Sequence, residues 1–267
     1  MPDIQQLLSL MARLRDPEQG CPWDLDQDFK SVVPHTLEEA YEVAHTIESG
    51  DLGELCDELG DLLFQVIFYA QLAQERGAFD FGDVITAISD KIVRRHPHVF
   101  GTLDTPDAVA QRQMWEAIKA QERQDREGEG MTPPGALDGV ALALPALPRA
   151  VKLQRRAARV GFDWDTPQPV LEKIREELAE LEAELTAGAG HDRIEDEFGD
   201  VLFTCANLAR HLNVDAEAAL RRTNAKFERR FRRVEAILHE AGIDVVSADL
   251  ETLEAAWQQA KGEESER

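Results

Sequence analysis

The sequence predicts an all-α protein made of two homologous helical domains, each packed as a helix bundle. Apolar residues recur at helical spacing along most of the 267 residues, a pattern typical of amphipathic helices. Strand-like alternation is confined to the neighbourhood of Val245 and Val246. The chain also repeats itself in order. Helices that bury apolar stripes against one another form bundles, so this architecture is expected in each half.

The repeat consists of short segments that occur twice in the same order. The pairs are GCPWD (20–24) and GFDWD (161–165), LEEAYEV (37–43) and REELAEL (175–181), DELGDLLF (57–64) and DEFGDVLF (196–203), DKIVRRH (90–96) and AKFERRF (225–231), and WEAIK (115–119) and WQQAK (257–261). This order indicates a duplication. The predicted domains are residues 1–124 and 140–267, and the Gly-, Pro- and charge-rich segment 125–139 is the predicted linker.

Composition excludes several partners and compartments. The formal net charge of −23 would repel nucleic acid and anionic membranes, so neither is an expected partner. The three cysteines form no CxxC pair, which fits a reducing cytosol, and Cys56 and Cys205 are expected in the core. We see no signal-peptide pattern and no apolar run long enough to span a bilayer. The expected location is the cytoplasm.

The first predicted functional feature is a group of carboxylates on two neighbouring helices. Glu39 and Glu42 share one helix face, and Glu58 and Asp61 share a face of the next helix. A short loop between the helices would make them antiparallel neighbours with their acids facing one another. Such a group needs neutralisation, and all-oxygen ligation favours Mg²⁺, Mn²⁺ or Ca²⁺ over Zn²⁺.

The second half repeats this acidic group with one additional member. Its residues are Glu176, Glu177, Glu180, Glu197 and Asp200. A solvated acidic stripe is the alternative reading, and the repetition of the pattern favours a metal. Gly60 and Gly199 lie inside the acid-bearing helices, where glycine disfavours the helix and suggests close helix approach.

Basic residues supply the second part of the predicted site. Lys226, Arg229 and Arg230 follow Asn224 and correspond to Lys91, Arg94 and Arg95 of the first half. Cations near metal-loaded acids suggest a polyphosphate ligand. Trp257 and Lys261 lie one helical turn apart and offer an aromatic plate beside a cation, although the tryptophan could equally belong to the core. Pro97 interrupts the basic segment of the first half only.

The segments EEAYEV…DELGDLLF and EELAEL…DEFGDVLF, with KFERRF and WQQAK, resemble the MazG nucleoside triphosphate pyrophosphohydrolases, in the long form with tandem domains. The resemblance implies binding of Mg²⁺, with Mn²⁺ as a substitute, and cleavage of NTPs and dNTPs to nucleoside monophosphate and pyrophosphate. It also implies a homodimer, in which dimerisation completes a four-helix bundle, and a catalytic C-terminal domain.

On this resemblance, the metal ligands are Glu177, Glu180, Glu197 and Asp200, and a secondary N-terminal set is Glu39, Glu42, Glu58 and Asp61. The predicted substrate-binding residues are Lys173, Arg193, Asn224, Lys226, Arg229, Arg230, Trp257 and Lys261.

The expected mechanism is metal-assisted hydrolysis, in which the spare carboxylate of Glu176 orients water or accepts its proton. The alternative function is a non-catalytic helical protein that senses nucleotides or binds partners and uses the acids structurally.

Overall fold

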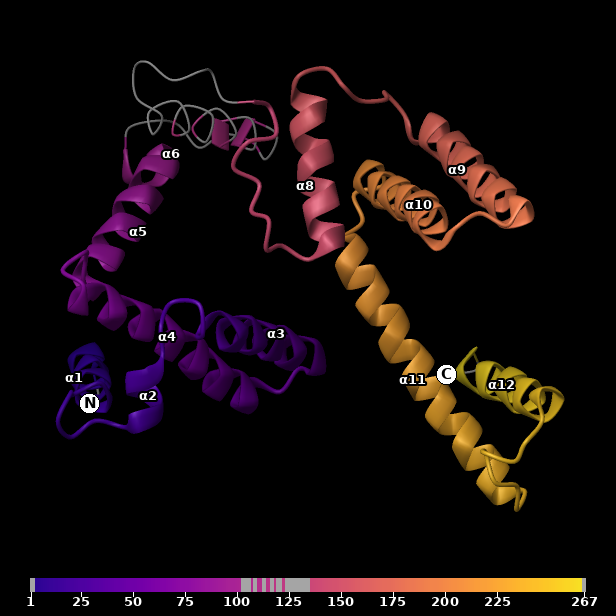
Figure 1. The fold of residues 1–267 in the computed structure, drawn as a ribbon, viewed down its shortest axis with the longest axis horizontal. Helices are drawn as coiled ribbons and strands as arrows, with labels where there is room; N and C mark the ends of the chain where they lie inside the picture. Colours follow the sequence, from indigo (N-terminus) through magenta and orange to yellow (C-terminus); the bar gives the residue numbers. More distant parts are fainter. Residues whose placement is uncertain are drawn as a thin grey trace. The chain divides into compact units, whose positions relative to one another are not determined.

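The structure, a computed structural model, describes residues 3–101 and 135–265 together with Asp107, Ala110, Gln111, Met114, Trp115, Ile118 and Glu122. Throughout this part of the chain the regular structure is helical (Figure 1), as predicted. The chain divides into two compact units, unit 1 (Met1–Glu129) and unit 2 (Gly130–Arg267). Most of the predicted linker, 125–139, lies outside the described residues, so its bounds stay a prediction.

Unit 1 contains a helical hairpin that rests on a small apolar core. Its helices are α1 (Ile4–Leu14), α2 (Pro22–Asp26), α3 (Val33–Ser49), α4 (Leu52–Glu75), α5 (Phe81–Arg95) and α6 (Pro97–Phe100). Helix α4 packs against α3, α1 and α5. The core comprises Met11, Val32, Ile67, Phe68 and Leu72, so α1 and α4 contribute most of its residues.

Unit 2 repeats the hairpin and extends it with a long helical pair. Its helices are α8 (Ala146–Arg159), α9 (Pro167–Ala187), α10 (His191–His211), α11 (Ala216–Glu240) and α12 (Leu250–Ser265). Helix α10 packs against α9 and α8, and α12 packs against α11. The core between α11 and α12 comprises Val234, Leu238, Ala256 and Ala260. This core places α12 along the C-terminal half of α11.

Both hairpins turn sharply at a glycine. Helix α3 ends at Gly50, whose φ of 80° is left-handed, and Asp51 caps α4 by accepting from the backbone N–H of Gly53 and Glu54. Helix α9 ends at Gly188 with φ 67°. Glycine adopts this conformation without the steric cost that a Cβ imposes. Each turn therefore brings its two acid-bearing helices side by side.

The basic helix is shorter in unit 1, as the position of Pro97 predicts. Helix α5 ends at Arg95 and α6 begins at Pro97, whereas α11 continues for 25 residues. Proline lacks the N–H that a helix interior requires, so the helix breaks there.

Two expectations about packing inside the acid-bearing helices are wrong for a single chain. A Cβ added at Gly60 or Gly199 meets no heavy atom within 4 Å outside its own helix, so neither glycine marks close helix approach within the chain. Cys56 and Cys205 are exposed, not buried. Both pairs lie on helix faces that the hairpin leaves uncovered, because one neighbouring helix can bury only one stripe of each helix.

None of the described helices combines the length and the apolar character that crossing a bilayer requires.

Candidate active site

Three carboxylates of unit 2 converge between α9 and α10. One oxygen from each of Glu177, Glu197 and Asp200 lies within 4.8 Å of the others. Glu177 is buried, with 6% of the residue exposed. The hairpin creates this cluster because α9 and α10 run side by side. Helix α9 contributes Glu177, and α10 contributes Glu197 and Asp200, which lie three residues apart and therefore share a helix face. Carboxylates this close favour a positive partner.

Unit 1 builds the matching cluster from Glu39, Glu42 and Glu58. Glu39 aligns with Glu177, and Glu58 aligns with Glu197, so two of three positions are the same in both clusters. The third acid differs: unit 1 contributes Glu42 from its first helix, and unit 2 contributes Asp200 from its second. Between them, the two clusters use all four positions of the predicted ligand pattern.

The fourth carboxylate of each unit lies close to its cluster. In unit 1, the charge of Asp61 contributes to raising the pKa of Glu39. In unit 2, Glu180 shares a hydrogen bond with Glu177 that contributes to raising the pKa of Glu180. The structure thus brings three of the four predicted acids together in each unit, and the fourth interacts with one member of its cluster.

The pKa values of these acids reflect their crowding. Loss of solvent is the main cause of the raised pKa of Glu39, and repulsion from Asp61 and Glu42 adds to it. Loss of solvent, followed by repulsion from Glu42, raises the pKa of Glu58. Loss of solvent is also the main cause of the raised pKa of Glu180. A bound cation would reverse this effect, because it favours the ionised carboxylate.

Lys173 provides a fixed positive charge beside the unit 2 cluster. Its Nζ lies 2.7 Å from Glu176 Oε1 and 2.8 Å from Glu177 Oε1. These two hydrogen bonds raise the pKa of Lys173. The aligned residue of unit 1 is His35, whose Nδ1 lies 3.7 Å from Glu38 Oε2. Unit 2 thus has a lysine ammonium, a permanent cation near pH 7, where unit 1 has a histidine.

The structure pairs the predicted phosphate-binding arginines with acids of the chain itself. Arg229 Nη2 lies 2.6 Å from Glu264 Oε1, and Arg230 also pairs with Glu264. Arg94 and Arg95 of unit 1 pair in the same way with Glu122. The two arginines of each unit therefore bind an acid that follows the Trp/Lys segment, a role that the sequence analysis missed.

The remaining predicted substrate residues of unit 2 occupy three places. Asn224 and Lys226 are exposed on α11. Trp257 packs against Phe227, with ring centroids 5.3 Å apart, and lies 6.0 Å from the guanidinium of Arg230. Lys261 is exposed on α12. Arg193, at the start of α10, pairs with Glu184 of α9. The predicted residues on α11 and α12 thus form their own cluster around Trp257. Arg229 and Arg230 in this cluster pair with Glu264 of α12 and not with the acids of α9 and α10.

A cavity of about 630 Å³ adjoins the unit 2 acids. Its lining includes Lys173, Glu177 and Asp200 together with side chains of α8 and the segment that precedes α9. Four polar residues in this lining are more than nine-tenths buried: Gln154, Glu177, Thr204 and Asn207. Gln154 and Asn207 were not among the predicted site residues. The sequence gives a signal for Asn207, because it is a polar residue within a largely apolar run of α10.

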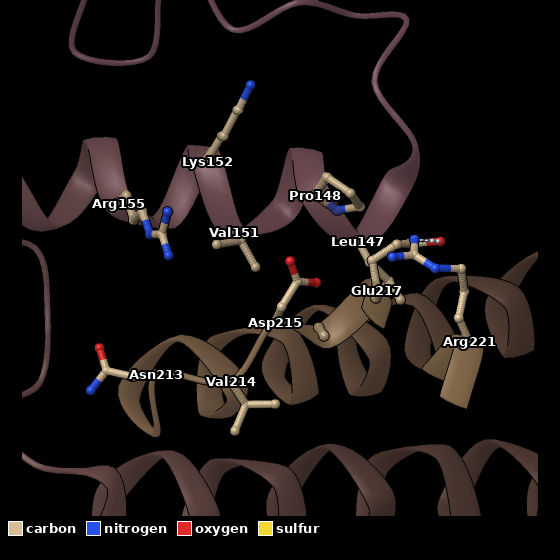
Figure 2. Close-up of a pocket in the computed structure, with 11 residues that line it drawn as sticks. Leu147, Pro148, Val151, Lys152, Arg155, Asn213, Val214, Asp215, Glu217 and Arg221 are labelled. Carbon is tan, nitrogen blue, oxygen red and sulfur yellow. Dashed lines mark ion pairs between the residues drawn. The ribbon is translucent and has the colours of Figure 1, made fainter. Parts of the chain in front are cut away.

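A second hollow lies between α8 and the start of α11 (Figure 2), and contains none of the predicted site residues. Glu217 and Arg221 pair across one helical turn at 4.0 Å. Asp215 caps α11 by accepting from Ala218 N. Asp215 and Glu217 therefore serve helix α11, and the candidate site is the α9–α10 cluster with the adjoining cavity.

Fold and site together define the class of the protein. It is an all-α protein with duplicated carboxylate clusters, and an all-oxygen donor set of this kind suits a hard divalent cation. The family model for the MazG nucleotide pyrophosphohydrolase domain matches residues 27–100 and 165–234. The chain belongs to this family, and it contains the domain twice.

Full-length relatives support the assignment. The chain is 50% identical to the nucleoside triphosphate pyrophosphohydrolase of Escherichia coli K12 over 265 residues, 99% of both chains. It is 42% identical over 259 residues to the nucleoside triphosphate pyrophosphohydrolase/pyrophosphatase MazG of Thermotoga maritima, covering 97% of this chain and 96% of that protein. The crystal structure of a mazG-related protein from Thermotoga maritima matches 44% of this chain and 99% of its own, at 26% identity and a TM-score of 0.38.

Proposed function

We propose that the protein hydrolyses nucleoside triphosphates, both NTPs and dNTPs, to nucleoside monophosphate and pyrophosphate, and that unit 2 carries the reaction. The observation that supports this most is the convergence of Glu177, Glu197 and Asp200 within 4.8 Å at a cavity that Lys173 also lines. The proteins named nucleoside triphosphate pyrophosphohydrolase that the chain resembles over its whole length add to this support. A cytoplasmic location remains a prediction.

The proposed metal ligands are Glu177, Glu180, Glu197 and Asp200, and the secondary set is Glu39, Glu42, Glu58 and Asp61. Mg²⁺ is the proposed ion, with Mn²⁺ as a substitute; when bound, such an ion neutralises phosphate charge and lowers the pKa of bound water. The hydrogen bond that Glu180 shares with Glu177 supports the assignment, because it places the carboxylate of Glu180 beside that of another proposed ligand.

Glu176 is the proposed residue that orients water or accepts its proton. It adjoins Glu177 in the sequence, and its side chain is 58% exposed, so water reaches it. Lys173 holds its carboxylate at 2.7 Å and so fixes the position of a group that can accept a proton. Lys173 is itself a proposed phosphate contact, and it would exchange a carboxylate partner for a phosphate when substrate binds.

The proposed phosphate contacts on α11 and α12 are Lys226, Arg229, Arg230 and Lys261, with Asn224 and Trp257 beside them. In the single chain Glu264 occupies both arginines. A polyphosphate carries more negative charge than one carboxylate and binds guanidinium in the same forked geometry. Substrate can therefore replace Glu264 as the partner of these arginines. In the same way, a phosphate can replace Glu184 as the partner of Arg193.

A homodimer is the proposed assembly. The α9–α10 hairpin leaves Leu178, Leu185, Phe198 and Leu202 exposed, and α11 leaves Phe227 exposed. Exposed apolar surface of this extent is typical of an interface. A second hairpin packed on this face would complete a four-helix bundle. Sedimentation equilibrium checks this assembly, because a monomer at micromolar concentration would contradict it.

The test of the activity identifies its products. Purified protein is incubated with Mg²⁺ and each of the common NTPs and dNTPs, and pyrophosphate, orthophosphate and monophosphate are measured separately. We expect pyrophosphate and monophosphate in equal amounts, and we expect EDTA to abolish their formation. Orthophosphate as the first product would indicate a phosphatase instead. The absence of any product would favour a protein that senses nucleotides without hydrolysing them.

A further inference from the structure

The cavity beside the unit 2 acids has a second, neutral part. Glu177 and Asp200 belong to its charged lining, whereas Leu153, Ala157 and Phe203 contribute apolar surface. Its volume of about 630 Å³ falls in the range of small-molecule sites. A cavity that adjoins acids but is lined largely by neutral groups suits a ligand with one charged end and one flat, weakly polar end.

Gln154 lines this cavity, and its side chain has an unused hydrogen-bond acceptor. Gln154 is 7% exposed, and its Nε2 donates to the backbone carbonyl of Phe203 at 2.8 Å. This bond fixes the orientation of the amide, because the reverse orientation would bring two oxygens together. Among the described residues, Oε1 is buried and has no hydrogen-bond partner. A buried acceptor without a partner is unfavourable, so this position calls for a ligand N–H.

Asn207 complements this acceptor with a donor. Its Oδ1 already accepts from Arg210 Nε at 2.9 Å and from Arg210 Nη2 at 2.8 Å. Asp163 holds the same arginine through Nη1 at 2.9 Å. With the oxygen thus committed, the amide of Asn207 offers its NH₂ group. The cavity lining therefore includes a fixed acceptor and a fixed donor.

We propose that this cavity binds the base of the nucleotide and that Gln154 Oε1 accepts a hydrogen bond from an N–H of the base edge, an inference that rests on the proposed function. Purines and pyrimidines have edges with neighbouring N–H donors and N or O acceptors, and their faces pack on apolar side chains. A phosphate oxygen has no hydrogen to offer Gln154 Oε1. The base therefore occupies the neutral part of the cavity, and the phosphates extend toward the acids.

Unit 1 provides a natural comparison for this pocket. In the aligned helices DELGDLLFQVIF (57–68) and DEFGDVLFTCAN (196–207), Phe68 stands where unit 2 has Asn207. Phe68 is 2% exposed and belongs to the unit 1 core with Met11 and Ile67. A phenyl ring at this position replaces the amide donor with apolar volume. Both units thus have the acids, whereas only unit 2 has a polar residue at this pocket position.

The experiment compares Gln154→Leu and Asn207→Phe with Gln74→Leu, an exposed position on α4 that serves as a matched control. The KM and kcat for each common NTP are measured with the full-length protein, and circular dichroism verifies folding. Because Gln154→Leu removes one neutral hydrogen bond, we expect KM to rise about threefold to tenfold with kcat nearly unchanged. We expect Asn207→Phe to raise KM further, Gln74→Leu to resemble wild type, and Mn²⁺ binding, measured by electron paramagnetic resonance, to be unaltered in all three.

A second measurement needs no variant. The better substrate among ATP and UTP is compared with its analogue that lacks the edge N–H, purine riboside triphosphate for ATP or N3-methyl-UTP for UTP. Wild type should prefer the natural nucleotide about threefold or more, and Gln154→Leu should reduce this preference. Unchanged KM values in the folded variants, or no preference in wild type, would overturn the base pocket. Absence of pyrophosphate from wild type with every nucleotide would instead contradict the proposed function.

Discussion

Units 1 and 2 have the same acids but different surroundings. Glu39 and Glu58 of unit 1 correspond to Glu177 and Glu197 of unit 2, and each pair lies in a three-carboxylate cluster. Around them, the duplicated positions diverge: His35 corresponds to Lys173, and Phe68 corresponds to Asn207. The basic helix α5 also stops before Pro97, whereas α11 continues.

This comparison separates metal binding from substrate binding. A carboxylate cluster requires only two helices and a sharp turn, and both units retain these. Holding a nucleotide requires, in addition, a permanent cation, a polar pocket and a long basic helix, and unit 2 combines all three. We infer that unit 1 retains a metal site without the neighbouring groups that a nucleotide needs, which makes unit 2 the expected site of turnover.

The largest expected effect comes from removing one acid in each unit. We expect Asp200→Ala to lower kcat about hundredfold or more, equivalent to roughly 2.7 kcal/mol of the activation barrier, because it removes a proposed metal ligand of the catalytic unit. Glu180→Ala should behave in the same way. Asp61→Ala and Glu42→Ala, the matched changes in unit 1, should retain most of the activity. Steady-state pyrophosphate release measures all four.

The control for these acid variants is folding. Removing a carboxylate from a crowded cluster can relieve repulsion, so circular dichroism and thermal melts must accompany the kinetics. Equal inactivity of folded Glu42→Ala and folded Glu180→Ala would show that both units are needed and would refute the division between them.

The second prediction exchanges the cation of unit 2 for its unit 1 counterpart. Lys173→His removes a permanent charge beside Glu176 and Glu177. A charge-assisted contact contributes about 1.5–3 kcal/mol, so we expect kcat/KM at pH 8 to fall about tenfold to hundredfold. The reciprocal change, His35→Lys, should leave activity within about twofold of wild type. Lys173→Arg should recover part of the loss; activity of Lys173→His equal to wild type would exclude Lys173 from the site.

The third prediction concerns Glu264, the acid that pairs with the two arginines proposed to bind phosphate. Glu264→Gln removes the ion pairs with Arg229 and Arg230. Exposed ion pairs contribute about 0–1 kcal/mol, so we expect KM for NTPs to decrease up to about fivefold with kcat little changed. Glu122→Gln, the matched change at Arg94 and Arg95, should alter neither constant. A rise in KM for folded Glu264→Gln would show that Glu264 positions the arginines and does not compete with phosphate.

The smallest expected effect is on how the stability of the fold depends on pH. Glu39, Glu58 and Glu180 have raised pKa values in the fold, so the folded protein binds more protons than the unfolded chain between the ordinary and the raised pKa. Their contribution to stability is therefore present below the ordinary pKa of a glutamate and is lost as pH rises through the raised values. Without metal, Glu58→Gln and Glu180→Gln should raise Tm at pH 7 by no more than a few degrees.

Calorimetry with and without Mg²⁺ checks this prediction. Because a bound cation neutralises the cluster, saturating Mg²⁺ should stabilise wild type more than either variant. The surface-exposed Glu228→Gln on α11 is a control outside the clusters. A lower Tm for both metal-free cluster variants at pH 7 would contradict the repulsion that the raised pKa values indicate.

Much of this organisation was predictable because it depends on local chemistry. Helical spacing predicted the helices, and the repeat predicted two units. The turn glycines Gly50 and Gly188, with φ of 80° and 67°, allow each pair of acid-bearing helices to become neighbours. Pro97 predicted the end of α5. Acids that share a helix face across a short loop can hardly avoid one another, so the clusters also followed from spacing.

Other features depended on residues far apart in the chain. The pairing of Arg230 with Glu264 joins positions 34 residues apart, and the contact of Gln154 with Phe203 joins positions 49 apart. No local spacing predicts such contacts. The expectation that Gly60 and Gly199 mark close helix approach was wrong for the same reason, because sequence cannot show which stripe of a helix its neighbour covers.

The sequence by itself determined the helical class, the duplication and the types of residue available for metal chemistry, since helical periodicity and side-chain chemistry are properties of short segments. Only the tertiary structure decided which acids converge, which cations are already paired, and that a neutral cavity adjoins the acids of unit 2. The converging acids and the cavity of unit 2 arise when α8, α9 and α10 pack together, and the paired arginines arise when α12 packs against α11. A single position, Phe68 in one unit and Asn207 in the other, contributes to a packed core in the first and to a polar pocket in the second.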